Sequence, residues 1–504
     1  MEYFSILDLK KTEEEILYMP GFFLDLNLDQ LLKLIQEQAP AYDIGPYYYR
    51  LPENGECEAY RRQVYDDVKN QLVYECLEQF SAMMRQAGEF EGNQFSLENQ
   101  LQKNAWYAAG VYSYCKAVSD LQEKLESLDI RSLGLRRFSD YLKTYVNQEG
   151  FRRRKEEAFR IRKAIDDFSL VLVIENNKLT VTPGTVDGAY ETFLGESCKY
   201  NSPFLLSMRM SELEEEIFRI YRKKYPELFD EIRRFVRDFP NFEDETIKRF
   251  EKEIQYYLAF YRFEEKMKTQ GFVFCVPDRN EEKFMEACGL YDLALACSNY
   301  VRDKAVVSND FAYHPGESFF VVNGPNQGGK TTFARSLGQL VYFAKMGLDV
   351  PAESANIHQF SGLLTHFSVE ESMETGRGKL MEELERLAPM MVKEAKGAFV
   401  IINELFTTAA HYDGCIMGAR VLEHFIGNQC RGIYVTHLKE LGDAVNGVVT
   451  MTAMLDGSDA HRRTFKILRH KAMDIGYAED IVEKYQLAYD KLHERLEKEK
   501  ERWQ

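Results

Sequence analysis

The chain has 504 residues, a length that suggests about three domains. Hydrophobic residues make up 45% of the sequence and charged residues 29%, as is typical of a globular protein with enough apolar side chains for a sizeable core. The net charge of −17 argues against a surface that coats nucleic acid everywhere, although a local basic patch is compatible with it.

Two further features bear on the location of the protein. No apolar run approaches the roughly 20 residues needed to cross a bilayer, and acidic residues stand at the N-terminus where a secretory signal would be basic and then apolar. We therefore expect a cytoplasmic protein that does not act at membranes. The nine cysteines are scattered without a C-x-x-C pair, so the sequence indicates neither a zinc site nor a disulfide framework.

Residues 1–270 are predicted to be mostly helical, because proline is sparse and apolar residues recur at spacings of three and four. Asn27 or Asp29 is expected to cap the start of a helix. The segment from Pro40 to Gly55 reads as an irregular connection, and Tyr60 opens a further long helical stretch.

Two long antiparallel helices are expected between residues 211 and 268, with a break near Pro240. The second helix carries a continuous apolar stripe made of Ile247, Phe250, Ile254, Tyr257, Tyr261 and Phe263. Helices of this length can act as rigid struts. After residue 270 the pattern changes to short strand-like pieces and turns, so we place a domain boundary there.

One β-hairpin is predicted inside the helical region, within residues 168–190. Leu170–Ile174 and Leu179–Val181 are apolar runs that flank four polar residues. A basic run precedes the hairpin and consists of Arg152, Arg153, Arg154 and Lys155. Two interpretations of this run remain open. It is either a solvated helix face or a stripe that contacts DNA phosphates.

The most specific motif lies between Phe319 and Arg335, where the sequence fits G-x-x-x-x-G-K-[ST] in full. A buried-strand run precedes it and a helix-forming stretch, 332–346, follows it. Glycines let backbone N–H groups surround phosphate oxygens, and the helix N-terminus adds partial positive charge. We therefore predict a nucleoside triphosphate site formed by Gly324, Pro325, Asn326, Gln327, Gly328, Gly329, Lys330, Thr331 and Thr332. Lys330 would reach the β- and γ-phosphates, and the Thr331 hydroxyl would ligate Mg²⁺.

Two later strands supply candidates for the catalytic side of this site. The apolar run 398–402 ends in Asn403 and Glu404. Glu404 is the candidate general base, and Asn403 stands where an Asp usually holds Mg²⁺, here through water. The strand at 432–435 ends in Thr436 and His437, whose imidazole would lie near the γ-phosphate. The alternative for His437 is a hydrogen-bonded structural role.

Taken together, these motifs resemble the MutS family of ABC-type ATPases. The residues that carry the resemblance are Gly324–Thr332, Gly347–Ala352, Asn403 and Glu404 with Tyr412–Gly414, and Val435–His437. More weakly, Tyr60–Val64 and the paired long helices are similar to the family's core and lever region. The resemblance covers most of the chain and is diagnostic only in its C-terminal half.

The resemblance implies a multidomain fold of α and α/β parts, in which a mostly helical core and lever region precedes an ABC-type P-loop α/β ATPase domain. The expected divisions are 1–270, with 168–190 as a reduced clamp, 271–456 for the ATPase domain, and 457–504 as a C-terminal helical dimerisation segment. Within the last segment a helix is expected at 478–500. The family also implies a dimer in which each nucleotide is completed by the partner's signature loop, here Gly376, Arg377 and Gly378.

This sequence departs from the family pattern at several points. We expect it to lack the mismatch-recognition and connector domains. Asn403 replaces the expected Asp, and Gly378 replaces the signature serine. We expect a slow ATPase that uses ATP and Mg²⁺ and acts as a homodimeric clamp on branched or unusual duplex DNA rather than on mismatches. The alternative is a nucleotide-gated interaction protein with little hydrolysis that grips a protein or ribonucleoprotein partner.

Overall fold

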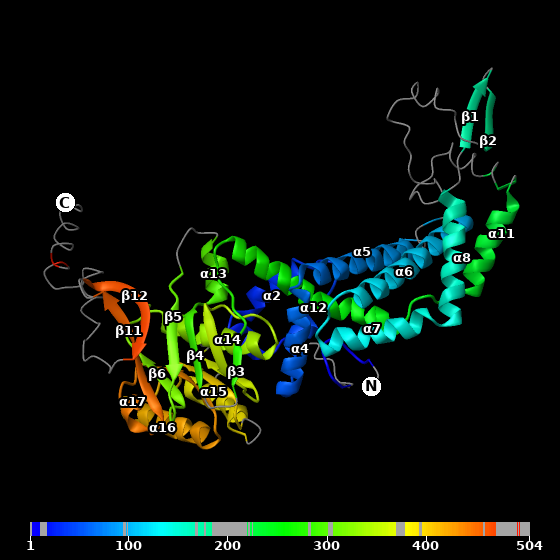
Figure 1. Ribbon diagram of the computed structural model, residues 1–504. Coiled ribbons are helices and arrows are strands. Elements are labelled where there is room, and N and C mark those ends of the chain that lie inside the picture. The colour runs from blue at the N-terminus through cyan, green and yellow to red at the C-terminus, as the bar shows by residue number, and fades with distance from the viewer. Residues whose placement is uncertain are drawn as a thin grey trace, which may run out of the picture. The chain divides into compact units, whose positions relative to one another are not determined.

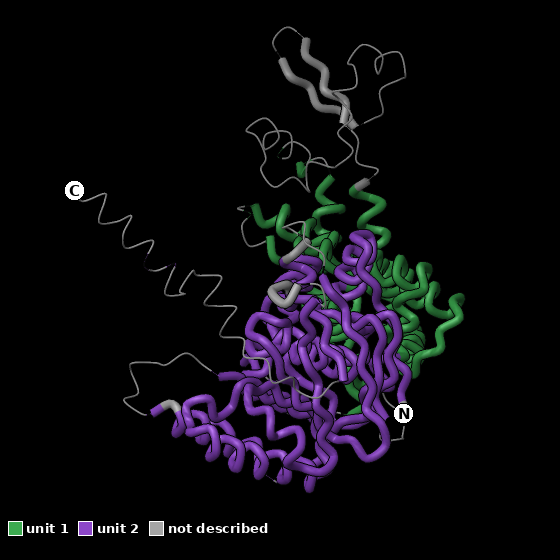
Figure 2. The backbone as a smooth tube through the Cα atoms, turned by 90° about the vertical axis from the view of Figure 1, so that its left-hand side faces the viewer, with its two compact units in different colours: residues 1–11, 63–258 green, residues 12–62, 259–504 purple. Residues whose placement is uncertain are grey.

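The computed structural model describes residues 3–10, 18–93, 97, 99–166, 170–175, 178–183, 219, 222–223, 225–280, 284–300, 306–368, 378–392, 396–456, 459–469, 491 and 493. The chain divides into two compact units (Figure 2): unit 1 contains Met1–Lys11 and Gln63–Leu258, and unit 2 contains Thr12–Arg62 and Ala259–Gln504. In the described part of the chain, no helix combines the length and the apolar character that a membrane crossing needs. The expectation of a multidomain fold with helical and α/β parts is confirmed.

Unit 1 is built from long helices (Figure 1): α5 (Gln71–Asn93), α6 (Gln100–Ser127), α7 (Leu133–Val146), α8 (Glu149–Asp166) and α11 (Pro226–Asp238). Side chains cap two of their starts. Asn99 accepts hydrogen bonds from the N–H groups of Leu101 and Gln102, and Ser132 accepts one from Leu135. Such caps satisfy N–H groups that have no partner inside the helix.

Helices α11 and α12 (Glu245–Thr269) flank Pro240 as predicted. In the described residues, however, α11 packs against α6 and α8, so the expected antiparallel pairing with α12 is not seen. The Asp244 carboxylate accepts hydrogen bonds from the N–H groups of Thr246 and Ile247, which explains where α12 begins. The apolar stripe of α12 is buried, apart from Tyr261, which is half-buried. The stripe therefore belongs to the core of the protein.

The predicted hairpin is confirmed. Strands β1 (Leu170–Glu175) and β2 (Lys178–Pro183) pair antiparallel, with Ile174 opposite Leu179. The remaining residues of the expected clamp region, 168–190, lie outside the described residues.

Unit 2 holds two sheets. The larger has the strand order β12-β11-β6-β10-β9-β8, and the smaller has the order β3-β7-β4-β5. The strands of the larger sheet are β6 (Phe319–Asn323), β8 (Leu363–Phe367), β9 (Phe399–Asn403), β10 (Arg431–Val435), β11 (Val448–Asp456) and β12 (Asp459–Arg469). Those of the smaller sheet are β3 (Asp278–Asn280), β4 (Met285–Leu290), β5 (Asn309–Tyr313) and β7 (Ser354–His358). In the larger sheet neighbouring strands pair in parallel, except that β12 is antiparallel to β11.

The larger sheet is covered on both faces. Val400 and Ile402 of β9 belong to an apolar cluster with Leu422 and Phe425 of α16 (His411–Gly427). Ile401 points the other way, as strand alternation requires, and lies against α14 (Lys330–Lys345). Strands buried on both faces explain the continuous apolar runs that the sequence shows there.

The remaining helices of unit 2 are α1 (Gly21–Asp25), α2 (Leu28–Gln36), α3 (Gly45–Tyr49), α13 (Leu293–Tyr300), α15 (Lys379–Leu387), η4 (Ala388–Met391) and α17 (Leu441–Ala444). Helix α4 (Gly55–Val68) contains the division between the units at residue 62, and α12 contains the one at residue 258.

The N-terminal segment does not follow the predicted domain division, which placed all of residues 1–270 in one helical region. Residues 12–62 belong to unit 2, because they bond to α14: Gln339 donates to the Leu26 carbonyl at 3.0 Å, and Tyr342 to the Tyr48 carbonyl at 2.8 Å. The segment expected to be irregular contains α3, and α4 begins at Gly55 rather than at Tyr60. Asn27 stands at the N-cap of α2 with a left-handed φ of 56°, and its side chain makes no capping hydrogen bond.

The predicted boundary at residue 456, between the ATPase domain and a C-terminal helical segment, also differs from the structure. Strand β12 pairs with β11, with Met451 opposite Arg469, so residues 459–469 continue the larger sheet instead of opening a helical segment. An added antiparallel strand satisfies the edge of β11. The helix expected at 478–500 lies outside the described residues, apart from two isolated positions.

A buried ionic cluster ties α14 to the N-terminal segment. The Lys345 ammonium is 2.8 Å from a Glu58 carboxylate oxygen, and it also donates to the Phe360 carbonyl at 2.8 Å. Arg279 lies 3.0 Å from the other oxygen of Glu58. Lys345 and Glu58 are only 1% and 3% exposed, so each charge depends on its partner.

Replacing Glu58 with Ala should lower the free energy of unfolding of unit 2 by about 3–5 kcal/mol, because two cations lose their buried counter-charge. Urea denaturation followed by circular dichroism measures this loss. The matched control is Glu53→Ala, whose side chain is 71% exposed beside Arg50 and should change stability by less than about 1 kcal/mol. Equal effects of the two variants would contradict the role assigned to the cluster.

Candidate nucleotide-binding site

The glycine-rich loop joins the buried central strand β6 to the N-terminus of α14, as the sequence predicts. Gly324 and Gly329 have left-handed φ values of 128° and 89°. A Cβ on Gly324 would lie 2.9 Å from that of Ala453, and a Cβ on Gly328 would lie 2.9 Å from the Pro325 carbonyl oxygen. The loop is therefore too tight for side chains at these glycines, and its backbone stays open to a ligand.

Lys330 lies within the curve of this loop. Its ammonium donates to the carbonyls of Gly324 at 2.9 Å and Pro325 at 3.1 Å, and the residue is 5% exposed. Burial lowers the pKa of Lys330, while the nearby Glu404 carboxylate opposes that shift. A buried cation beside a helix N-terminus suits a phosphate group.

Thr331 and Asn403 meet across the carboxyl edge of the larger sheet. The Thr331 hydroxyl donates to the Asn403 amide oxygen at 3.0 Å. Hydroxyl and amide oxygens are ligands that Mg²⁺ accepts, so this pair fits the ion. An uncharged amide holds it less strongly than the usual carboxylate would.

Glu404 and His437 are brought together by the parallel pairing of β9 and β10. A Glu404 carboxylate oxygen lies 3.4 Å from Nε2 of His437, and both side chains are partly exposed. Glu404 has a left-handed φ of 57°, and its N–H donates to the Val435 carbonyl at 2.9 Å. Strained backbone of this kind persists only where surrounding structure fixes it.

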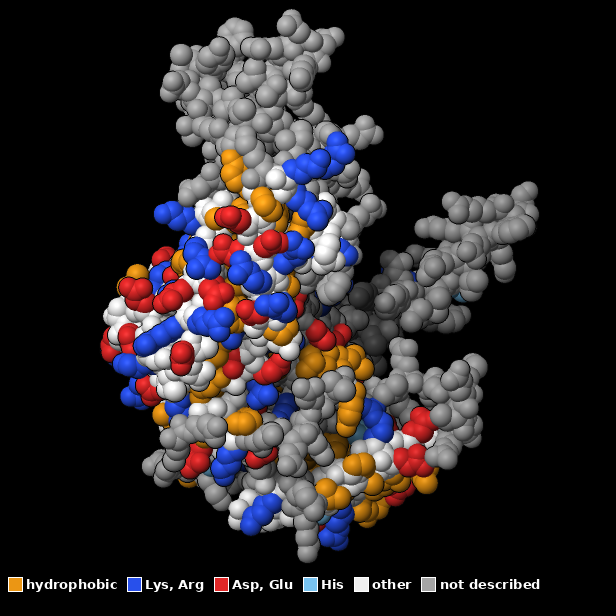
Figure 3. Space-filling view, turned by 90° about the vertical axis from the view of Figure 1, so that its right-hand side faces the viewer, with side chains coloured by type: hydrophobic (Ala, Val, Ile, Leu, Met, Phe, Trp, Pro, Cys, Tyr) orange, Lys and Arg blue, Asp and Glu red, His pale blue; other side chains and the backbone are white. Residues whose placement is uncertain are grey.

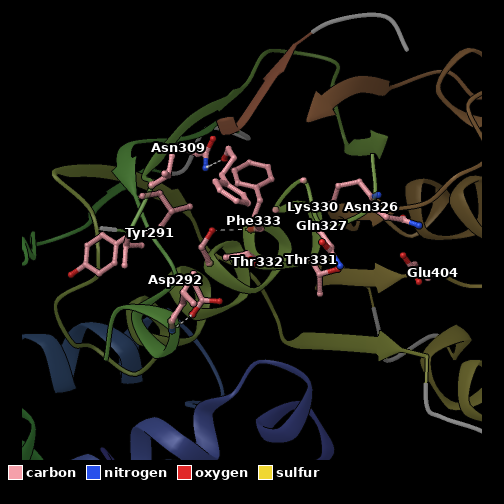
Figure 4. Close-up of a pocket in the computed structure, with 18 residues that line it drawn as sticks. Tyr291, Asp292, Asn309, Asn326, Gln327, Lys330, Thr331, Thr332, Phe333 and Glu404 are labelled. Carbon is pink, nitrogen blue, oxygen red and sulfur yellow. Dashed lines mark hydrogen bonds between the residues drawn. The ribbon is translucent and has the colours of Figure 1, made fainter. Parts of the chain in front are cut away.

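Lys330, Thr331 and Glu404 line a cavity of about 570 Å³, whereas Asn403 and His437 are not among its lining residues. In Figure 4 Glu404 lies at one end of the site, beyond Thr331 and Asn326, and Tyr291 lies at the opposite end. Lys330 and the residues that follow it line the middle. The cavity therefore combines the polar groups of the loop with other side chains, among them Tyr291 at the far end.

The apolar lining of the cavity comes from residues that the sequence motifs do not include. Its side chains are Leu290, Leu295, Val306, Val307 and Phe465. Asn309 fixes Phe465 in place, since its amide donates to the Phe465 carbonyl at 3.1 Å and accepts from Ile467 N–H at 2.8 Å. Such a surface beside a phosphate site suits an aromatic base.

Comparison with known proteins finds one matching family in this part of the chain. The family described as MutS domain V matches residues 320–481. The match is confined to the C-terminal half of the chain and supports a MutS-type domain there.

Several curated proteins are similar to part of the chain. The chain is 29% identical over 249 residues to a DNA mismatch repair protein MutS from Symbiobacterium thermophilum, a match that covers 48% of this chain and 27% of the relative. It is 34% identical over 125 residues to the DNA mismatch repair protein MSH6 of Arabidopsis thaliana, covering 25% and 9% of the two chains. For a MutS protein of Thermotoga neapolitana the identity is 24% over 270 residues, covering 53% and 32%. The chain thus spans a third or less of the relatives it matches.

Other predicted site residues lie elsewhere. Gly376 and Arg377 fall outside the described residues, and Gly378 is exposed at the N-cap of α15. The basic run lies on α8 in unit 1, where Arg153 pairs with Glu157 at 2.9 Å and Arg154 donates to the Phe242 carbonyl. Arg152 bonds to Asn147, and the Lys155 ammonium lies over the Phe159 ring.

Gly328→Ala should weaken ATP binding by about 5- to 150-fold, because overpacking costs roughly 1–3 kcal/mol and 1.4 kcal/mol corresponds to a factor of ten. Isothermal titration calorimetry measures the change. Gly362→Ala is the control, since a Cβ there meets no atom within 4 Å. Unchanged affinity in the Gly328 variant would show that the loop does not hold the phosphates as the geometry indicates.

Proposed function

We propose that this chain binds ATP with Mg²⁺ in the described site and hydrolyses it slowly. The observation that carries the proposal is the pairing of Glu404 with His437 at the ends of β9 and β10, on the sheet edge from which the loop of Lys330 also departs. A carboxylate and an imidazole beside a phosphate loop are the groups that water activation requires.

Each residue then has a distinct role in the reaction. The loop N–H groups and Lys330 would hold the phosphates, and Thr331 and, through water, Asn403 would hold Mg²⁺. The ion would neutralise charge on the phosphate oxygens. Glu404 orients the attacking water and takes its proton as the bond to the γ-phosphorus forms and that to the leaving ADP breaks, while His437 donates a hydrogen bond to the γ-phosphate. Phe465 and its apolar neighbours receive the adenine.

We further propose that the ATPase acts as a homodimer of the ABC type, in which the N-terminus of the partner's α15 completes each site. Gly378 leaves the first N–H groups of α15 without a side-chain cap, so they are available to a phosphate. Four large apolar side chains are exposed on α15 and α16: Met381, Leu384, Tyr412 and Ile416. Exposed apolar groups of this kind favour burial against a second copy.

The proposed ligand of the dimer is DNA, since the relatives named above are DNA mismatch repair proteins. On the face drawn in Figure 3, Lys and Arg side chains are interspersed with Asp and Glu rather than gathered into one continuous patch. Binding would therefore rest on a limited number of contacts to the backbone, which carry no sequence information. Recognition by shape favours branched or unusual duplexes over mismatched base pairs.

One observation favours a second candidate function. Thr331 and Asn403 form a neutral pair where a carboxylate is usual. A weakly held Mg²⁺ would slow ATP hydrolysis more than it would weaken ATP binding. Bound ATP would then hold the dimer closed without being hydrolysed. The chain would be a nucleotide-gated interaction protein that grips a protein or ribonucleoprotein partner.

Glu404→Gln should retain ATP binding and lower single-turnover hydrolysis at least about a hundredfold, as expected for loss of a general base. Asn403→Asp should raise the rate, because the carboxylate strengthens the hold on Mg²⁺. Glu423→Gln, an exposed position on α16, is the control and should leave the rate unchanged. Wild-type hydrolysis no faster than that of Glu404→Gln would reject the enzyme and leave the nucleotide-gated alternative.

The Glu404→Gln variant with ATP should bind a four-way DNA junction more tightly than a perfect or a mismatched duplex, and the affinity should fall with salt. Fluorescence anisotropy at two ionic strengths measures both effects. If the basic run contacts phosphates, Arg152→Ala should lower the slope of log affinity against log salt by about 1. Arg420→Ala, exposed on α16, is the matched control. Absence of salt-sensitive binding to every DNA would overturn the DNA proposal.

A further inference from the structure

A cluster of three potential metal ligands lies outside the proposed nucleotide site, on the segments that follow β9 and β10. His411 and Cys415 come from the first turns of α16, and Glu440 precedes α17. One ligand atom from each residue lies within 4.8 Å of the others. Within the described part of the chain, no other group of three or more His, Cys, Asp or Glu side chains has its ligand atoms this close together.

The helix places two of the ligands. Residues four apart on a helix lie on one face, one turn above the other, so the His411 imidazole and the Cys415 thiol point to the same side of α16. Glu440 approaches that side. One of its carboxylate oxygens lies 3.1 Å from Nε2 of His411, and the other lies 3.8 Å from Sγ of Cys415. The three donors therefore converge from two separate segments.

These separations match a tetrahedral ion. With Zn–S near 2.3 Å and Zn–N and Zn–O near 2.0–2.1 Å, tetrahedral angles put neighbouring ligand atoms about 3.3–3.6 Å apart. The observed distances reach that range with small side-chain rotations. A nitrogen, a sulfur and a carboxylate oxygen are ligands that zinc takes and that hard ions such as Mg²⁺ do not take as a set.

We propose that His411, Cys415 and Glu440 bind one Zn²⁺ or a similar borderline-soft divalent ion, with water in the fourth position. On binding, the thiol loses its proton to solvent and coordinates as thiolate. The ion would join the start of α16 to the segment that carries His437. This site goes beyond the proposed ATPase and does not depend on it, because no residue of the nucleotide site is a ligand.

The hydrogen-bonded cluster itself is the competing explanation. His411 and Glu440 form an ion pair when the imidazole is protonated, and the Cys415 thiol donates to Glu440. Such contacts on a partly exposed surface need no ion. A cluster held by hydrogen bonds alone would not bind a metal ion tightly through the Cys415 thiol. The test therefore measures metal binding that depends on this thiol.

The test is Co²⁺ titration of the full-length protein after treatment with a chelator. Wild type should bind one Co²⁺ per chain at this site and show thiolate-to-cobalt charge-transfer absorption, which Zn²⁺ should abolish by displacement. Cys415→Ser should lose that absorption, and His411→Ala and Glu440→Gln should bind Co²⁺ at least about tenfold more weakly, since even outer-shell changes cost 10–100-fold. Cys288→Ser, an exposed thiol elsewhere in unit 2, should behave like wild type.

Two results would overturn the proposal. One is charge-transfer absorption that survives in Cys415→Ser, which would assign the thiolate to another cysteine. The other is a wild-type protein that shows no such absorption with excess Co²⁺, which would leave a hydrogen-bonded cluster only. Circular dichroism of each variant confirms that it is folded, so a lost signal reports the ligand rather than the fold.

Discussion

The burial of helix α14 is the constraint on which the rest of unit 2 depends. Its N-terminus carries the glycine-rich loop, one side lies against β9, and four of its side chains bond to the segment before residue 62. Arg335, Gln339 and Tyr342 donate to backbone carbonyls of that segment. Lys345 meets Glu58 at the far end of the helix. A helix held along its whole length cannot rotate or slide easily, so the orientation of its first N–H groups is fixed before any ligand binds. This preorganisation lets a loop of small residues serve as a binding site.

Parallel pairing then collects the chemical groups. In an open sheet of parallel strands, ligands lie at the carboxyl ends of the strands. Here β6 ends before Gly324, β9 ends at Asn403 and β10 ends before His437, so segments more than a hundred residues apart in sequence meet at one edge. The same rule made the loop and the two strand-end pairs predictable from sequence, because each motif carries its own strand signal.

What the sequence did not predict depends on tertiary packing. Phe465 lies on a strand that extends the sheet by antiparallel pairing, and no nucleotide motif includes it; the Thr464–Ile467 alternation of polar and apolar residues was the available signal. Residues 12–62 were assigned to the helical region because helical periodicity is the same whichever unit a helix packs against. Glu58 and Lys345 show why: they lie 287 positions apart, and only the fold reveals that each is the other's counter-charge. The His411 and Cys415 pair was missed because a four-residue spacing on a helix is not a C-x-x-C motif.

The backbone after Glu404 connects the proposed catalytic base to the proposed dimer surface. Phe406 has a left-handed φ of 63°, and its N–H donates to a Glu383 oxygen at 3.0 Å. Glu383 is 4% exposed and lies on α15, the helix that begins at Gly378. A buried carboxylate that accepts a backbone hydrogen bond is costly to separate from its donor, so a displacement of α15 must carry the strained turn after Glu404 with it. If α15 contacts a partner's nucleotide, the position of the base in one subunit therefore depends on whether the other subunit is loaded.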